Sequence, residues 1–250
     1  MDVNRRYFVE YVLASGARTV LDYGCGNGEV VAELRRHGVD CYGADIFYEG
    51  GSFDDPALER LIADRVIRGF TPGGPVPFGD GEFDLIVSNQ VFEHVAYLRP
   101  AVAELDRMLA PGGVMYHHFP SREVLREGHI GIPLAHRMRP GRARTAYTLA
   151  LRTLGLGYHR TARPRPWTRR GLDWIDAYTF YRPYDEIERA FGDFEIRGRE
   201  ADYCRFRARG RRVRPLLSRF DGLQRIALRR LAFMALEMRR RKAPTGIEPV

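Results

Sequence analysis

The residues best suited to chemistry fall in two parts of the sequence, where acids and histidines stand beside glycines. The first part, Asp22-Tyr23-Gly24-Cys25-Gly26-Asn27-Gly28, places three glycines at alternate positions after an acid. Glycines at this spacing permit a tight turn and let the backbone approach a ligand closely. The second part, residues 94–136, contains five of the seven histidines. Together they predict a ligand-binding turn and, near it, side chains able to accept a proton.

The glycine turn departs from the phosphate-binding pattern of dinucleotide sites. That pattern, G-x-G-x-x-G, needs its last glycine at the position that Glu29 occupies here. A carboxylate at the start of the following helix suits the helix dipole but repels phosphate. We therefore expect the turn to bind a ligand that lacks phosphates.

Residues 19–119 are expected to form the elements that position these side chains. Short β-branched runs alternate there with longer segments of helical spacing, which is typical of a parallel sheet with helices on both faces. The expected strands are Thr19–Tyr23, Val39–Ala44, Arg65–Arg68, Phe83–Ser88 and Val114–Phe119. The expected helices are Asn27–His37, Pro56–Ala63 and Pro100–Leu109. Both chemical segments then meet at the carboxyl ends of the strands, where such sheets bind ligands.

The pattern changes after Pro120. Residues 120–172 are rich in Gly and Pro around one helix, Thr145–Leu154, and are interpreted as an insertion within a single domain, 1–250. The core comprises 15–120 and 175–240, with a basic C-terminal segment at 205–242. The remaining elements expected are a helix at Tyr184–Phe191, a strand at Phe194–Tyr203, a helix at Leu216–Leu231, and either helix or closing strand at Leu231–Met238.

Asp22-x-Gly24-x-Gly26-x-Gly28 resembles motif I of the class I S-adenosylmethionine-dependent methyltransferases, in particular the small-molecule enzymes of types 11 and 23. Pro77–Asn89, Gln90–Val95 and Leu109–Val114 resemble later segments of that family in the same order. The resemblance implies an α/β, Rossmann-like, doubly wound sheet, mostly parallel with an antiparallel last strand. It also implies S-adenosylmethionine as the cofactor.

The same resemblance implies which residues hold the cofactor. The three glycines would lie beneath its methionine part, Asp22 would hold its amino group, and Asp45, 21 residues after Gly24, would bind the ribose hydroxyls. Many relatives have an acid facing adenine, but this chain has Arg68-Gly69-Phe70, so packing by Phe70 or a backbone hydrogen bond is expected instead. The cofactor set predicted is Asp22, Gly24, Gly26, Gly28, Asp45, Ile46, Phe70 and Asn89.

The acceptor side of the site is expected to use histidines and glutamates. His94 and His129 are the candidate catalytic bases, and the residues predicted to contact substrate are Glu93, His118, Glu127 and His129. Residues 127–133 resemble an E-G-H-x-G-x-P segment of some bacterial methyltransferases. Strand alternation sends His117 and His118 to opposite faces, so at most one can face substrate. We expect the insertion to line the acceptor cavity.

No metal site is predicted from the sequence. Some relatives bind a divalent cation through E-x-x-E-H, but here Gln90 replaces the first acid of that motif, which removes one ligand and one charge. Cys25, Cys41 and Cys204 are odd in number and lack C-x-x-C spacing, so neither a disulfide framework nor a structural zinc site is indicated.

The positive charge gathers in two segments. The net charge is +8, yet residues 137–170 contain ten arginines and no acid, and residues 205–242 contain fourteen basic residues against two acids. These segments fit solvated faces, an anionic membrane surface approached by an amphipathic stretch at Leu216–Arg241, or nucleic acid. No recognised nucleic-acid module accompanies them, so a nucleic-acid partner is disfavoured.

The sequence as a whole favours a cytoplasmic, bacterial-type methyltransferase. It has no signal-peptide pattern and no apolar run of transmembrane length. The predicted acceptor is a small molecule, sugar or glycan, or lipid-linked compound, methylated on oxygen. Two alternatives are a protein that binds the cofactor without turnover and a nucleic-acid methyltransferase that uses the basic segments. The sequence gives no oligomeric state.

Overall fold

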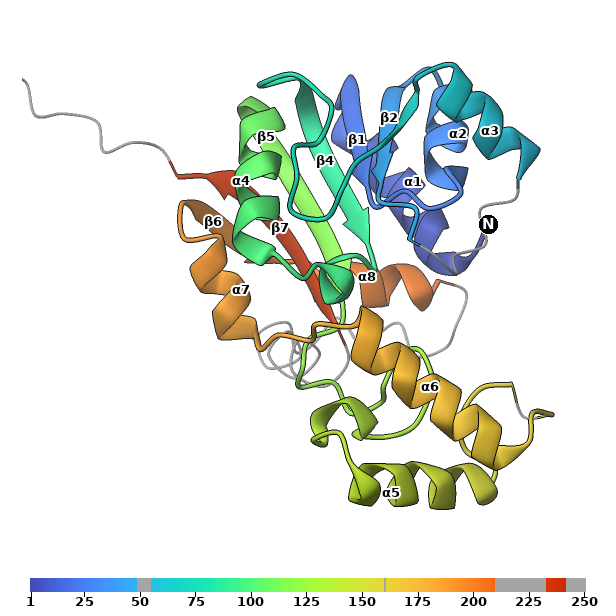
Figure 1. Ribbon diagram of the computed structural model, residues 1–250. Coiled ribbons are helices and arrows are strands. Elements are labelled where there is room, and N and C mark those ends of the chain that lie inside the picture. The colour runs from blue at the N-terminus through green and yellow to red at the C-terminus, as the bar shows by residue number, and fades with distance from the viewer. Residues whose placement is uncertain (49–54, 160, 210–232, 242–250) are drawn as a thin grey trace, which may run out of the picture.

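A seven-stranded sheet forms the centre of the computed structural model, which describes residues 1–48, 55–159, 161–209 and 233–241 (Figure 1). Its order is β3-β2-β1-β4-β5-β7-β6, and the first five of these strands are parallel. β7 is antiparallel to both of its neighbours. The strands are β1 (Thr19–Tyr23), β2 (Asp40–Asp45), β3 (Ile67–Gly69), β4 (Phe83–Asn89), β5 (Leu109–Phe119), β6 (Phe194–Gly198) and β7 (Met234–Arg240). The predicted mostly parallel sheet with an antiparallel last strand is confirmed.

Helices cover both faces of this sheet. One face packs against α1 (Val3–Ser15), α2 (Glu29–Arg36), α3 (Pro56–Ala63) and α8 (Glu200–Arg207), and the other against α4 (Leu98–Met108) and α7 (Tyr184–Ala190). In β4, Leu85 and Val87 join the first core and Ile86 joins the second, as the two-residue period of a strand requires. A buried strand of this kind reads as continuously apolar, which is why β4 was predictable.

The first helix, α1, has no counterpart among the elements expected from sequence. Its N-terminus is capped by the Asp2 carboxylate, which accepts hydrogen bonds from the backbone N–H groups of Asn4 and Arg5. It ends at Gly16, whose φ of 71° is left-handed. Tyr7 and Phe8 bury its inner face against the sheet. This helix brings Arg5 to the ligand-binding edge.

Two further helices, α5 (Arg142–Thr153) and α6 (Pro164–Tyr178), lie together below the sheet in Figure 1. They share a small core of their own that includes Trp167, Leu172 and Ile175. The helix predicted at Thr145–Leu154 corresponds to α5, but the sequence analysis predicts no helix at α6, whose first part lies in the Gly- and Pro-rich insertion. Proline at the first helical position is tolerated, since that N–H has no helical partner. α6 runs across the predicted end of the insertion at residue 172.

Arginines of the basic segment 137–170 help to build this unit. Arg152 is buried, and its guanidinium donates to the backbone carbonyls of Leu156, Tyr158, His159 and Ala162. It also lies 4.4 Å from the Trp167 ring centroid. Arg144, also buried, pairs with Asp176 of α6 at 2.5 Å. At these two positions the interpretation as a solvated face is wrong, because each guanidinium joins α5 to the segment that follows it.

The strand predicted at Phe194–Tyr203 is wrong in its second half. β6 ends at Gly198, after which the Arg199 N–H donates to the Ala235 carbonyl at 2.7 Å and the chain enters α8. Tyr203 then packs its ring edge-on against Tyr7, 5.1 Å away, and the burial of this ring favours the helix over continued pairing. The closing-strand alternative for the C-terminal region is confirmed by β7. The helix predicted at Leu216–Leu231 lies outside the described residues.

The point where the strand order reverses is a typical position for a ligand site in such a sheet. β1 has β2 on one side and β4 on the other, so the chain connections leave in opposite directions and open a crevice at the carboxyl ends. The turns after β1, β2 and β4 all meet there. None of the described helices has the length and apolar character needed to cross a membrane.

Candidate active site

The turn after β1 depends on glycine for two different reasons. Gly24 has a φ of 78°, and a Cβ atom placed on it would lie 2.3 Å from the Val91 side chain, so a larger residue is excluded by contact. Gly26 has a φ of 53° with no atom within 4 Å of such a Cβ. Its open side faces the crevice, where it exposes backbone to a ligand. Gly28 (φ 71°) completes the turn and caps α2.

Asp45, the last residue of β2, ties this turn to the next strand. One carboxylate oxygen accepts a hydrogen bond from the Gly26 N–H at 2.8 Å, and the other accepts from the Phe47 N–H at 2.9 Å. The Phe70 N–H in turn donates to the backbone carbonyl of Asp45 at 3.1 Å. The side chain is 8% exposed and borders the cavity. Each carboxylate oxygen retains accepting capacity for ligand hydroxyls.

Asp22 lies one strand away from Asp45 and is almost fully buried. Burial raises the pKa of its carboxyl to about 7, the negative charge of Asp45 adds to the rise, and Arg5 opposes it. Arg5 is itself paired with Glu29 of α2 at 3.0 Å. A cationic ligand group near Asp22 would favour the ionised carboxylate and relieve this unfavourable charge state.

A cavity of about 600 Å³ extends from the glycine turn toward α6, within the range typical of small-molecule sites. Its walls are largely apolar and aromatic. Among the predicted site residues, Gly24, Gly26, Asp45, Ile46, Phe70 and His94 line it. Residues that sequence reasoning missed also line it, namely Arg5, Tyr23, Tyr48, Val91, Tyr97, Tyr178 and Phe180.

The other predicted cofactor residues lie at the edge of this cavity or behind it. Asp22 and Gly28 are buried under the turn, and neither lines the cavity. Asn89 ends β4, and its side-chain oxygen is 3.4 Å from His118 Nδ1. Its neighbour Gln90, whose φ of 58° is left-handed, is the residue that reaches the cavity wall. Direct cofactor contact at Asn89 stays a prediction.

His117 and His118 point to opposite faces of β5, as predicted from strand alternation. His117 Nδ1 is 2.8 Å from Ser88 Oγ, and its ring packs against Phe92. The His118 ring packs against Tyr203 at 4.5 Å on the other face. Burial lowers the pKa of each imidazole to about 3, so both are neutral. Neither lines the cavity, and substrate contact at His118 stays a prediction.

Glu127, which is fully buried, and His129, which is partly exposed, form a hydrogen-bonded pair in the segment after β5. One Glu127 oxygen accepts from His129 Nδ1 at 2.7 Å and from the Tyr181 hydroxyl at 2.7 Å. The other oxygen accepts from the backbone N–H groups of His129 and Ile130, at 2.8 and 2.5 Å. Burial opposes ionisation of Glu127, but these donors outweigh it and lower its pKa to about 2. Glu127 is therefore an ionised, fully engaged acceptor.

Glu93 and His94 occupy the short 3-10 turn Phe92–His94 that follows β4, and they face His129. His94 Nδ1 donates to the Tyr178 carbonyl at 2.6 Å, so its proton lies on Nδ1 and Nε2 keeps a lone pair. Burial lowers the pKa of His94, which keeps the ring neutral. Its ring centroid is 5.0 Å from that of His129, and Trp174 packs against both rings.

The predicted lining of the acceptor cavity by residues 120–172 is wrong for the large cavity. On that side its wall comes from Ala177, Tyr178 and Phe180, at and just beyond the end of α6. The Phe180 N–H donates to the Glu93 carbonyl at 2.6 Å, which holds this segment against the 3-10 turn that follows β4. Residues of the insertion, among them His129, Trp167 and Arg170, instead line a smaller cavity of about 370 Å³ together with Trp174.

The missed residues had only weak signals in the sequence. Tyr178, Phe180 and Tyr181 lie close together in sequence, at and just after the end of a helix that the sequence analysis does not predict. Recognition of the Asp2 cap would have predicted α1 and therefore the position of Arg5 near the glycine turn. Tyr181, which holds Glu127, lies 54 residues from it in sequence, and no local pattern links the two.

Comparison with known proteins identifies one family model. The model described as a methyltransferase domain matches residues 5–182, more than half of the chain. That range contains the glycine turn, Asp45, Glu93, His94 and His129.

Among curated proteins, a probable chloroplastic tocopherol O-methyltransferase of Oryza sativa subsp. japonica is 35% identical over 97 residues, covering 38% of this chain and 27% of that protein. A ubiquinone biosynthesis O-methyltransferase of Methylococcus capsulatus is 28% identical over 115 residues, covering 45% and 47%. A ubiquinone biosynthesis O-methyltransferase of Nitrosococcus oceani is 27% identical over 192 residues, covering 68% and 70%. The chain therefore spans half or less of the first two relatives.

Solved structures agree on the fold. An S-adenosylmethionine-dependent methyltransferase from Mesorhizobium loti has a TM-score of 0.51 at 20% identity, covering 90% of this chain and 91% of that one. The geranyl diphosphate C-methyltransferase from Streptomyces coelicolor A3(2), solved with Mg²⁺, geranyl diphosphate and S-adenosyl-L-homocysteine, has a TM-score of 0.50 at 15% identity, covering 95% and 79%. At these identities the likeness concerns the architecture.

Proposed function

Because the chain belongs to the methyltransferase domain family, as a class I S-adenosylmethionine-dependent methyltransferase, we propose that it methylates an oxygen atom of a small organic acceptor. The acceptor would be a small molecule, a sugar or glycan unit, or a lipid-linked compound. The observation that carries the proposal is the cavity, which is continuous from Gly26 and Asp45 to His94. One cavity therefore reaches both a cofactor turn and a neutral imidazole.

The residues at the end of the cavity beside the turn Gly24–Gly28, called the glycine end, fit S-adenosylmethionine. Gly26 exposes backbone on its open side, and Asp45 borders the same cavity with accepting capacity for the two ribose hydroxyls. Ile46 and Phe70 provide apolar walls for the adenine. The Asp22 carboxyl, whose pKa is raised to about 7 by burial and by the charge of Asp45, suits the cofactor's ammonium group, which would favour its ionised form. These residues would bind and orient the cofactor.

When bound, S-adenosylmethionine supplies a methyl group that an acceptor oxygen displaces, with the C–S electron pair returning to sulfur. His94 borders the cavity, and its Nε2 lone pair can accept the hydroxyl proton that the acceptor loses. The wall formed by Tyr178 and Phe180 excludes water and orients the acceptor. We assign His129, the second predicted base, to the same side of the cavity because its ring faces His94.

Oxygen is proposed as the nucleophile for two reasons. The relatives named above include a probable tocopherol O-methyltransferase and two ubiquinone biosynthesis O-methyltransferases. The cavity also presents aromatic walls at Tyr48, Phe70, Tyr97 and Phe180, which suit an aromatic or otherwise apolar acceptor that carries a hydroxyl group. A hydroxylated ring is therefore the first acceptor class to test.

Calorimetric titration with S-adenosylmethionine and S-adenosylhomocysteine tests the cofactor part of the proposal. Both should bind to the wild-type protein, and Asp45→Ala should weaken binding by about 10- to 150-fold, because a charged acceptor of two hydroxyls contributes about 1.5–3 kcal/mol. Asp40→Ala is the matched control, since Asp40 begins the same strand but is exposed and pairs with Arg35. Equal affinity in the Asp45 and Asp40 variants would remove Asp45 from the site.

Transfer itself is tested by supplying methyl-labelled cofactor with a panel of phenols, catechols, sugars and polyprenylated quinols. Label should appear in at least one hydroxylated acceptor as a methyl ether, and the His94→Ala variant should retain cofactor binding while losing turnover. Tight cofactor binding with no transfer across the panel would favour a protein that binds the cofactor without turnover. Label on nitrogen or carbon alone would overturn the proposed oxygen acceptor.

A further inference from the structure

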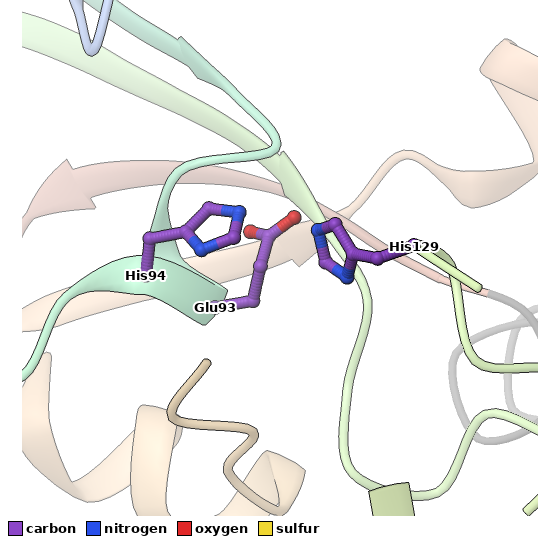
Figure 2. Close-up of side chains that lie close together, drawn as sticks. All are labelled: Glu93, His94 and His129. Carbon is purple, nitrogen blue, oxygen red and sulfur yellow. The ribbon is translucent and has the colours of Figure 1, made fainter. Parts of the chain in front are cut away.

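Three side chains that converge beside the cavity have the composition of a metal site. Glu93 and His94 come from the turn after β4, and His129 comes from the segment after β5, 35 residues later. One potential ligand atom from each lies within 4.8 Å of the other two. Figure 2 shows the Glu93 carboxylate between the two imidazole rings.

The Glu93 carboxylate lacks the partners that a buried acid normally has. Its side chain is 1% exposed, and neither oxygen has a hydrogen-bond partner among the residues that the structure describes. Buried carboxylates are usually paired, hydrogen-bonded or bound to a metal, so this one is missing a cation or a donor.

Both imidazoles are held in the orientation that metal ligands adopt. His94 Nδ1 donates to the Tyr178 carbonyl at 2.6 Å, and His129 Nδ1 bonds the Glu127 carboxylate at 2.7 Å. In each ring Nε2 is then the atom with an available lone pair. A carboxylate or carbonyl behind a histidine fixes its tautomer and raises its basicity toward a metal. Glu127 and the Tyr178 carbonyl are therefore positioning groups.

We propose that Glu93, His94 and His129 form a binding site for one divalent transition-metal ion, of which Zn²⁺ is the representative. Two nitrogens and one oxygen suit a borderline cation such as Zn²⁺, Co²⁺ or Fe²⁺ better than Mg²⁺, which prefers oxygen ligands. Metal–ligand bonds of about 2.1 Å require the ligand atoms to lie about 3.4 Å apart, so metal binding would draw these atoms closer than their present separation of up to 4.8 Å. Gln90 stands where the E-x-x-E-H motif has its first carboxylate, so His129 supplies the third ligand instead.

The site would act on the acceptor, and this step rests on the proposed function. Three protein ligands leave at least one coordination position open, and His94 borders the large cavity, so that position faces the acceptor. A hydroxyl oxygen bound there loses its proton to solvent more readily, because the cation lowers its pKa. The oxygen lone pair then forms the new O–C bond while the C–S pair returns to sulfur. With the metal bound, His94 and His129 would act as its ligands, and the role of His94 as a free base would apply to the metal-free protein alone.

The test uses the full chain, stripped of metal with a chelator and dialysed. Titration with Zn²⁺, and with Co²⁺ followed by its visible absorption, should show one equivalent bound. Glu93→Gln and His129→Gln should each weaken binding at least tenfold, and Glu127→Gln, which keeps the ligands but alters their orientation, by about tenfold. His37→Gln is the control, because it removes an exposed histidine next to Glu33 that could bind metal adventitiously.

Each outcome bears on a separate claim. Binding that survives in both Glu93→Gln and His129→Gln, or is lost only in His37→Gln, would overturn the proposed site. S-adenosylmethionine titration of the same samples shows whether each variant is folded. Cofactor binding without metal binding in the wild-type protein would overturn the metal inference alone. Metal binding without cofactor binding would instead overturn the proposed function and leave the site standing.

Discussion

Buried carboxylates at the two ends of the large cavity differ in their hydrogen bonding. The glycine end is the turn Gly24–Gly28 with Asp45, and the histidine end is His94 with the adjacent Glu93, Glu127 and His129. At the glycine end, each Asp45 oxygen accepts a backbone N–H, so the charge is stabilised by the chain itself. At the histidine end, Glu93 is more deeply buried and has no hydrogen-bond partner among the described residues. The glycine end is therefore preorganised for a ligand, whereas at the histidine end the Glu93 carboxylate needs a cation or a hydrogen-bond donor from a further component.

The same contrast separates the two glutamates at the histidine end. Glu127 accepts from two side chains and two backbone N–H groups, and its pKa is about 2, whereas burial places that of Glu93 at about 8. Neighbouring acids with such divergent pKa values are typical of functional sites. One acid is structural support and the other is available, so one substitution made at both positions should have opposite effects.

The largest effect is expected for Glu127→Met. The substitution leaves the Tyr181 hydroxyl, the Ile130 N–H and His129 without their acceptor in a buried setting. We expect the free energy of unfolding to fall by about 3 kcal/mol, measured by denaturant titration. Glu127→Gln should lose less, since its amide oxygen still accepts. A variant as stable as wild type would show that these donors find other partners.

A smaller effect of opposite sign is expected for Glu93→Met in the presence of chelator. Methionine matches the side-chain length and removes an unsatisfied buried carboxyl, so the free energy of unfolding should rise by about 1–2 kcal/mol. With Zn²⁺ added, only the wild-type protein should gain stability, through metal binding to its native state. Destabilisation of the chelated variant would contradict the description of Glu93 as unpartnered.

The glycine end was largely predictable because its parts are local or repeat along the chain. Asp22 to Gly28 is one continuous segment, and the resemblance to the methyltransferase family implies Asp45, which ends the next strand. Their backbone conformation is dictated by glycine, and strand order brings β1 and β2 together in register. The five parallel strands were predictable for the same reason, since each is a short apolar run bounded by turns. Boundaries shifted by a few residues.

The histidine end was not predictable as an arrangement, although its residues were named. It joins the turn after β4, the segment after β5 and the end of α6, whose packing depends on tertiary contacts such as Tyr178 to His94. Prolines at the start of α6 concealed that helix. Sequence clustering also grouped His117 and His118 with His94 and His129, although the first pair is enclosed in the core. Residue type and proximity in sequence do not distinguish core histidines from cavity histidines.

The smallest effect expected is a pH dependence of cofactor affinity that arises at the glycine end. The pKa of Asp22 is about 7, so its carboxyl is mostly protonated at pH 6 and mostly ionised at pH 7.5. Only the ionised form attracts the cofactor's ammonium group, so S-adenosylmethionine affinity should rise by at most about tenfold over this interval. The rise should be measured by calorimetry at matched ionic strength.

Asp22→Asn separates this effect from other titrations. The amide carries no charge at any pH in the interval, so the variant should bind weakly throughout and show a flat profile. Metal at the histidine end should leave the wild-type slope unchanged, because Asp22 interacts with Asp45 and Arg5 at the glycine end. An identical slope in the variant would assign the titration to another group. A slope that changed with Zn²⁺ would show that the two ends of the cavity are electrostatically coupled.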